Sequence, residues 1–88
     1  MPKVRASLRF KKAFVTLPPE IQAKVLKALL LLAENPRHPS LQAKPIHGIN
    51  GVLEARVDVS YRLTYERLSE DVLFLRSVGK HDETLKNL

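Results

Sequence analysis

The chain has 88 residues, 44% of them hydrophobic and 27% charged, which is the balance of a folded globule and predicts a single domain over residues 1–88. It has no cysteine, which excludes disulfides and thiolate metal sites, and its longest apolar run, Ala28 to Ala33, is far shorter than the roughly 20 residues that cross a bilayer. We therefore expect a cytoplasmic protein without a membrane partner, whose net charge of +6 suits either a polyanionic partner or simple solubility.

The N-terminal segment changes its period from that of a strand to that of a helix. Residues 3–8 alternate apolar and polar side chains, which is typical of a short, half-buried strand. Charges interrupt every apolar stretch here, so no export signal is visible. From about Arg9 to Leu17 the apolar residues recur at helical spacing, which predicts a first short helix.

A second helix is predicted from Pro18-Pro19-Glu20 to Glu34. Proline is pre-set for a first helical turn, an acidic residue there complements the helix dipole, and Asn35-Pro36 ends the pattern. Leu30 and Leu31 widen its apolar stripe, and we expect the first helix, rather than a partner protein, to cover them. The two helices therefore form an antiparallel hairpin. Prolines and glycines then recur through residues 36–51, which predicts a long structured loop.

The C-terminal half predicts three antiparallel strands. Residues 52–59 alternate, and after a bend near Ser60 the alternation returns in residues 61–66, as in a hairpin. The run 72–78 is apolar on both sides, as expected of a strand in the middle of a sheet. The predicted fold is α+β, a small antiparallel-dominated sheet with an N-terminal helical hairpin packed on one face, in the order β-α-α-β-β-β-short α, whose last helix falls within residues 81–88.

Alternation places a group of charged side chains on the face of this sheet that the helices leave open. Glu54, Arg56 and Arg62 project there with Thr64, while Arg76, Lys80 and His81 border the same area. An arginine fork matches phosphate oxygens in pairs, and a carboxylate and an imidazole can pass protons near neutral pH. Residues of these types predict a site for a phosphodiester.

Each of these residues also has a structural interpretation. Glu54 and Arg56 can form ordinary cross-strand charge pairs, and His81, followed by two acidic residues, resembles a helix start. Tyr61 and Tyr65 could stack on bases, but core packing is favoured because they share a face with Leu63. The scattered histidines lack metal-ligand spacing, and no cofactor fingerprint is present, so we expect neither a metal nor a cofactor.

Four segments together resemble the RelE/ParE toxin superfamily of bacterial toxin-antitoxin systems, and they span nearly the whole chain. They are Leu17-Pro-Pro-Glu-Ile-Gln-Ala-Lys-Val, Asn35-Pro-Arg-His-Pro-Ser-Leu, the run Gly51 to Tyr65, and Val78-Gly-Lys-His-Asp-Glu. The most diagnostic piece is Arg56 to Tyr65, in which an arginine-valine strand precedes Tyr-Arg-Leu-x-Tyr. The ending Gly79-x-His81 resembles that of the YafQ-type, ribosome-dependent members.

The resemblance implies a basic toxin neutralised by a cognate acidic antitoxin, which alone would bring it to operator DNA. In the nuclease branch the toxin enters the ribosome and cuts messenger RNA without a metal, through attack by the ribose 2′-hydroxyl. Carried over by position, Arg62 would stabilise the transition state, His81 would be the general acid or base, Arg56 would orient the phosphate, and Glu54 is a weaker transfer. The candidate RNA-binding residues are Arg76, Lys80, Lys44 and His47.

Two alternatives of the same fold stay open. Members of the ParE branch inhibit DNA gyrase without nuclease activity, and an inactive relative would only bind its antitoxin. Some histidine-dependent members carry another histidine near the position of Arg56, and several place an aromatic residue soon after the terminal histidine, where this chain has Asp82 and Glu83. The presence of His81 favours RNA cleavage.

Overall fold

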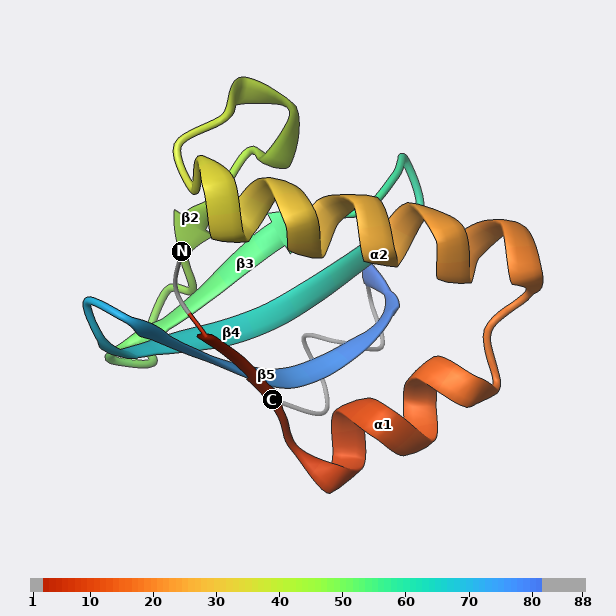
Figure 1. Cartoon of the computed structure of the whole chain (residues 1–88), viewed down its shortest axis with the longest axis horizontal. Helices are drawn as coiled ribbons and strands as arrows, with labels where there is room; N and C mark the ends of the chain where they lie inside the picture. The colour runs from red at the N-terminus through yellow and green to blue at the C-terminus, as the bar shows by residue number, and fades with distance from the viewer. Residues whose placement is uncertain (1–2, 82–88) are drawn as a thin grey trace.

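The computed structural model describes residues 3–81 and has two helices on one face of a five-stranded sheet (Figure 1). Strand β1 (Lys3–Ala6) precedes helices α1 (Leu8–Val15) and α2 (Pro19–Glu34). A 3-10 turn, η1 (Pro39–Leu41), and the short strand β2 (Lys44–Pro45) follow. Strands β3 (Val52–Arg56), β4 (Tyr61–Ser69) and β5 (Val72–Lys80) complete the fold. The α+β prediction is confirmed. Strand β2 is an additional strand, which was not predicted because it lies in the segment rich in proline and glycine.

The sheet has the order β1-β5-β4-β3-β2. Its neighbours pair antiparallel except β1, which runs parallel to β5. Strand β5 therefore has a neighbour on each side, as its two-sided apolar pattern predicts. The predicted C-terminal helix lies outside the described residues except for His81, which follows β5 directly.

The helices begin and end where their local chemistry dictates. The Ser7 hydroxyl accepts a hydrogen bond from the backbone N–H of Phe10 and so caps α1. Proline occupies the first turn of α2 and Glu20 follows it, while Asn35 ends the helix. The predicted limits of α2 are confirmed, and α1 ends at Val15, two residues before the predicted Leu17.

The hydrophobic core lies between the two helices and one face of the sheet. Leu32 and Val25 of α2 are fully buried against Ala55 and Leu63 of the hairpin β3–β4. Tyr65 is also buried in this core, so the prediction that it packs there is confirmed. The remaining buried members are Phe10, Ile21, Ala28, Leu41, Leu73, Leu75 and Val78. None of the helices within residues 3–81 is both long and apolar enough to cross a membrane.

Two expectations about the burial of apolar residues are wrong. Val59, expected on the inner face, is 76% exposed, because β3 ends at Arg56 and residues 57–60 form the turn to β4. Leu30, expected beneath the first helix, is 61% exposed. The two helices diverge instead of lying along each other, as Figure 1 shows. Helix α1 packs mainly on β5, so the outer side of α2 stays uncovered.

Candidate active site

A buried carboxylate joins three strands on the face of the sheet opposite the helices. Glu54 of β3 lies with its Oε1 3.6 Å from Nε of Arg62 on β4 and 3.7 Å from Nδ1 of His81 at the end of β5. The residues that neighbour Glu54, Ala55 and Leu53, face the core, so alternation turns the Glu54 side chain the other way. The structure thus brings together three residues that are distant in sequence.

The face that carries these residues is less open than alternation predicts. The side chain of Glu54 is only 5% exposed and that of Arg62 17%, whereas that of His81 is 43% exposed. Beside Glu54, the buried Thr64 hydroxyl lies 2.6 Å from the Ser77 hydroxyl of β5. The expectation that Glu54 and Thr64 stand in solvent is wrong, because neighbouring strands pack their polar side chains against one another here. Solvent and ligands reach the cluster mainly at His81.

The turn between β3 and β4 fixes the position of the Arg62 guanidinium. Nη1 of Arg62 donates to the backbone carbonyls of Asp58 and Tyr61. The Asp58 carboxylate in turn accepts hydrogen bonds from the backbone N–H groups of Ser60, at 2.9 Å, and Tyr61, at 2.8 Å. Burial raises the pKa of Asp58, but these two bonds and the Lys24 ammonium 3.4 Å away outweigh it and hold the pKa below its ordinary value. The charged carboxylate therefore stabilises the turn that holds Arg62.

Arg56 is the cross-strand neighbour of Arg62. The two residues lie directly opposite each other in the β3–β4 register, a position in which the Cβ atoms of a pair are about 5 Å apart. No ion pair joins Arg56 to a carboxylate among residues 3–81. It also lines a hollow of about 230 Å³ beside α2, together with Lys24, Lys27 and one carboxylate, that of Asp58. Like charges placed opposite each other repel, so this end of the hairpin favours an anion.

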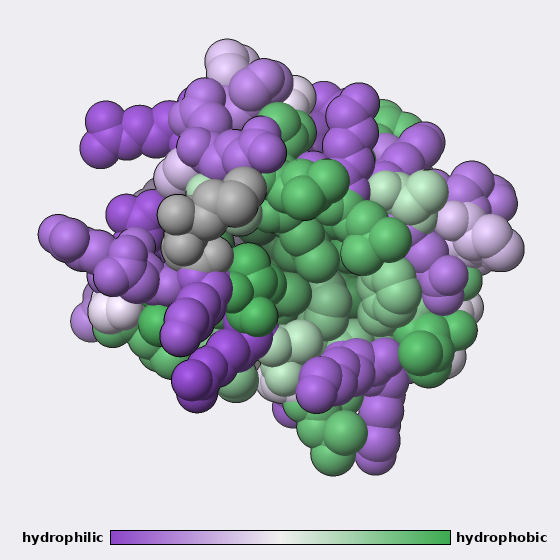
Figure 2. Space-filling model, in the orientation of Figure 1, coloured by the Kyte–Doolittle hydropathy of each residue, from purple (hydrophilic) through white to green (hydrophobic). Residues whose placement is uncertain are grey.

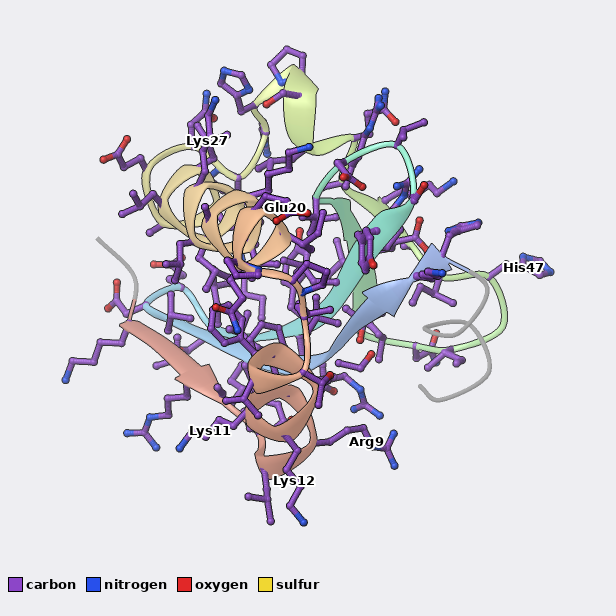
Figure 3. The ribbon with its side chains drawn as sticks, turned by 90° about the vertical axis from the view of Figure 1, so that its right-hand side faces the viewer. Arg9, Lys11, Lys12, Glu20, Lys27 and His47 are labelled. Atoms are coloured by element: carbon purple, nitrogen blue, oxygen red, sulfur yellow. The ribbon has the colours of Figure 1, made fainter. Side chains whose placement is uncertain are left out.

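The other candidate residues are placed in different ways. Lys44 lies opposite Glu54 in the β2–β3 register, so it borders the cluster. Arg76 lies 3.0 Å from Glu66 in an ion pair farther along the sheet. Lys80 is paired with Tyr61 and alternates with His81, which places it toward the helix side. His47 points away from the body of the protein, from the loop after β2 (Figure 3).

Sequence reasoning missed the roles of Asp58 and Ser77, and it placed Thr64 on this face without its buried hydroxyl partner. Asp58 does have a recognisable signal, because aspartate often accepts a hydrogen bond from the backbone two residues on, as it does here from Ser60. The contact between Thr64 and Ser77 has no such signal, since it depends on the β4–β5 register. That register contains an irregularity between Thr64 and Tyr65, which alternation alone does not predict.

The cluster can perform proton transfer beside a bound phosphate. Arg62 supplies a fixed positive charge, and His81 presents an imidazole at the accessible edge. The Glu54 carboxylate neighbours both, so it can balance the charge of Arg62 and orient the histidine ring. Such an arrangement suits the cleavage of a phosphodiester, a reaction in which the transition state gains negative charge, one oxygen loses a proton and another gains one.

Similar folds occur among solved structures, whereas no protein-family model and no curated protein sequence matches the chain. YafQ from Escherichia coli BL21(DE3) aligns with 96% of this chain and 98% of its own at 21% identity and a TM-score of 0.75. The intact E. coli RelBE toxin-antitoxin complex aligns over 91% of this chain and 96% of the other at 26% identity and a TM-score of 0.74. The YoeB/ParE toxin from Agrobacterium tumefaciens, at 15% identity, covers 90% of this chain and 98% of its own with a TM-score of 0.76.

Proposed function

We propose, because the chain has the fold of the RelE/ParE toxin superfamily, that it is the toxin of a type II toxin-antitoxin pair and cleaves messenger RNA on the ribosome without a metal ion. The observation that carries the proposal is the convergence of Arg62 and His81 on the Glu54 carboxylate. Its net charge of +6 is consistent with a nucleic-acid substrate. The same charge suits an acidic antitoxin.

In the proposed reaction the ribose 2′-oxygen attacks the adjacent phosphorus and gives up its proton. The bond from phosphorus to the 5′-oxygen breaks, and that oxygen gains a proton. His81 exchanges a proton with one of these oxygens at the exposed edge of the cluster, and Glu54 orients its ring. Arg62 and Arg56 hold the phosphate and stabilise its extra negative charge, while Lys44 and Arg76 bind the flanking strand.

Primer extension on translated messages tests this assignment. Induction of the wild-type chain should produce cuts within codons, and Arg62→Ala or His81→Gln should reduce them at least about 100-fold, as expected for loss of a charge-stabilising or proton-transferring group. Arg5→Ala is the matched control, because Arg5 is an exposed arginine of β1, at the opposite edge of the sheet from β2. Cutting that persists in both site variants excludes these roles, and intact messages accompanied by DNA damage favour a gyrase inhibitor.

We propose that the antitoxin covers the apolar groove between α1, α2 and β1. This groove of about 360 Å³ is lined by apolar side chains with Lys11 at its edge, and Figure 2 shows a continuous hydrophobic surface on this face. Leu26 and Leu30 of α2 are one turn apart and 54% and 61% exposed. An amphipathic antitoxin segment with acidic flanks fits such a surface, and RelE and YafQ are crystallised with antitoxins.

The groove makes a direct prediction about antitoxin binding. The single change Leu26→Asp should weaken the complex with the antitoxin encoded next to this chain by at least about tenfold, because Leu26 lines the groove and the change places a charge in the apolar contact. Leu68→Asp, at another exposed leucine in β4, is the control. Titration calorimetry would contradict the proposal if both variants bound as wild type.

A further inference from the structure

A second hollow lies on the helix side of β3 and β4, the opposite face of the sheet from the Glu54 cluster. It has a volume of about 470 Å³, within the range of small-ligand pockets. Its walls come from the loop after α2 and from the helix-side face of β3 and β4. The lining residues are Pro36, Arg37, His38, Pro39, Gln42, Ala43, Leu53, Tyr65 and Arg67. Arg67 is five positions after Arg62, or about 17 Å along a strand, and the hollow opens on the other face of the sheet, so the two sites are distinct.

The hollow is lined by positively charged side chains, those of Arg37 and Arg67, without an acidic side chain beside them. No carboxylate is among the lining residues. Within residues 3–81, the side chains of Arg37 and Arg67 make neither an ion pair nor a hydrogen bond, whereas Arg62 and Arg76 each have a glutamate partner. Two arginine forks that line one hollow can match the oxygens of a phosphate group.

The floor of the hollow is apolar and offers hydrogen-bond donors at its edges. Tyr65 is 3% exposed and lies opposite Leu53 in the β3–β4 register, so its ring forms part of the floor. Burial raises the pKa of Tyr65 although the charge of Arg67 lowers it, so the hydroxyl keeps its proton. His38 accepts the Ser40 N–H at Nδ1, which leaves its ring hydrogen on Nε2. The site is therefore rich in donors, as an anion requires.

Gln42 supports a ligand role for this hollow. Its backbone adopts a φ of 45°, a left-handed conformation that glycine reaches at no steric cost and that other residues adopt rarely. A glutamine side chain at such a position lines the hollow beside the arginines. Its amide both donates and accepts, which matches the paired donor and acceptor on the edge of a nucleobase.

From these observations we propose that the hollow binds one nucleotide of single-stranded RNA, with its phosphate between Arg37 and Arg67 and its base on the Tyr65 and Leu53 floor beside Gln42. The inference rests on the proposed function in that RNA is the substrate, and it adds a subsite away from the cleaving residues. An acidic peptide would satisfy the arginines but would leave the apolar floor and the Gln42 amide without a counterpart.

Titration of the ¹⁵N-labelled full chain with 5′-AMP, followed by NMR, tests the subsite. Saturable shifts are expected at Arg37, Gln42 and Arg67, and inorganic phosphate should bind more weakly than 5′-AMP. The double variant Arg37→Gln/Arg67→Gln should lose at least tenfold in affinity, while Lys3→Gln/Arg5→Gln, which removes the same charge from β1, should keep it. Gln42→Gly should weaken binding without lowering the melting temperature.

The same titration separates this inference from the proposed cleavage. Arg62→Ala should abolish cutting yet bind 5′-AMP here as wild type does. If the wild-type chain cuts no message but still binds 5′-AMP at Arg37 and Arg67, the proposed function fails and the subsite stands. The inference is overturned by unsaturable binding, by equal losses in the two double variants, or by an oligoglutamate peptide that binds the hollow more tightly than 5′-AMP.

Discussion

Removal of the Asp58 carboxylate should destabilise the chain through the turn between β3 and β4. In Asp58→Ala, the backbone N–H groups of Ser60 and Tyr61 lose the acceptor that now lies within 2.9 Å of each. Loss of a side chain that caps backbone N–H groups lowers the unfolding free energy by up to about 2 kcal/mol. We expect this upper value here because the Asp58 carboxylate accepts two hydrogen bonds. For a chain of this size, that cost lowers the melting temperature by about 8–16 °C.

The variant Asp58→Asn separates the hydrogen bonds from the charge. Asparagine keeps an oxygen for Ser60 and Tyr61 but loses the ion pair with Lys24, whose ammonium is half exposed. Exposed pairs of this kind contribute less than about 1 kcal/mol. The asparagine variant should therefore be closer in stability to wild type than to the alanine variant, as measured by urea unfolding followed by circular dichroism.

The pH dependence of this effect has a definite sign. Because the folded state holds the pKa of Asp58 below its ordinary value, the carboxylate contributes its full stability above about pH 4, and the contribution is lost as the pH falls through the lowered folded-state value. The difference in unfolding free energy between wild type and Asp58→Ala should thus be constant from pH 7 to pH 5 and narrow below pH 4. A difference that stays constant down to pH 2, or an asparagine variant as unstable as alanine, would refute the reasoning.

Two further predictions concern the polar face of the sheet. Thr64→Val leaves the buried Ser77 hydroxyl without its 2.6 Å partner and should lower the unfolding free energy by about 1–3 kcal/mol. Thr64→Val/Ser77→Ala removes both hydroxyls and should recover part of that loss. Equal unfolding free energies for the two variants would argue against the contact. A double-mutant cycle of Glu54→Gln and Arg62→Gln should give a coupling energy of about 1 kcal/mol, since the two side chains are mostly buried and 3.6 Å apart. If the losses of unfolding free energy in the two single variants simply add up in the double variant, the pair is not formed in solution.

Local patterns predict most of this fold because each depends on neighbouring residues. The alternation of residues 52–56 and 61–66 predicts a hairpin, and the β3–β4 register pairs these two segments. Pro19 and Asn35 mark the ends of α2 in the sequence and in the structure. The parallel pairing of β1 with β5 has no local signal, because it joins segments about 70 residues apart, and neither does the short β2.

The sequence predicted that Glu54, Arg62 and His81 lie near one another, but not how buried they are or what holds them in place. Alternation places Glu54 and Arg62 on one face, but it treats that face as solvated. The burial of Glu54 follows from contacts with Arg62 and His81, which come from different strands. The hydrogen bonds from Arg62 to the turn carbonyls depend on a turn geometry that the Asp58 carboxylate stabilises. Such features arise from register and turn structure, which sequence periodicity does not encode.

The contacts of Arg62 indicate how it would meet a phosphate in the proposed reaction. Nε faces Glu54 and Nη1 is held by two carbonyls, so the described contacts leave Nη2 for a ligand. Arg56 lies opposite with no carboxylate partner among residues 3–81. Arginines at directly opposed positions of two strands repel each other, and the Glu54 carboxylate, which pairs with Arg62, offsets only part of that repulsion. A phosphodiester that contacts both arginines would offset the remaining repulsion. This stabilisation is largest when the phosphate carries the extra negative charge of the transition state.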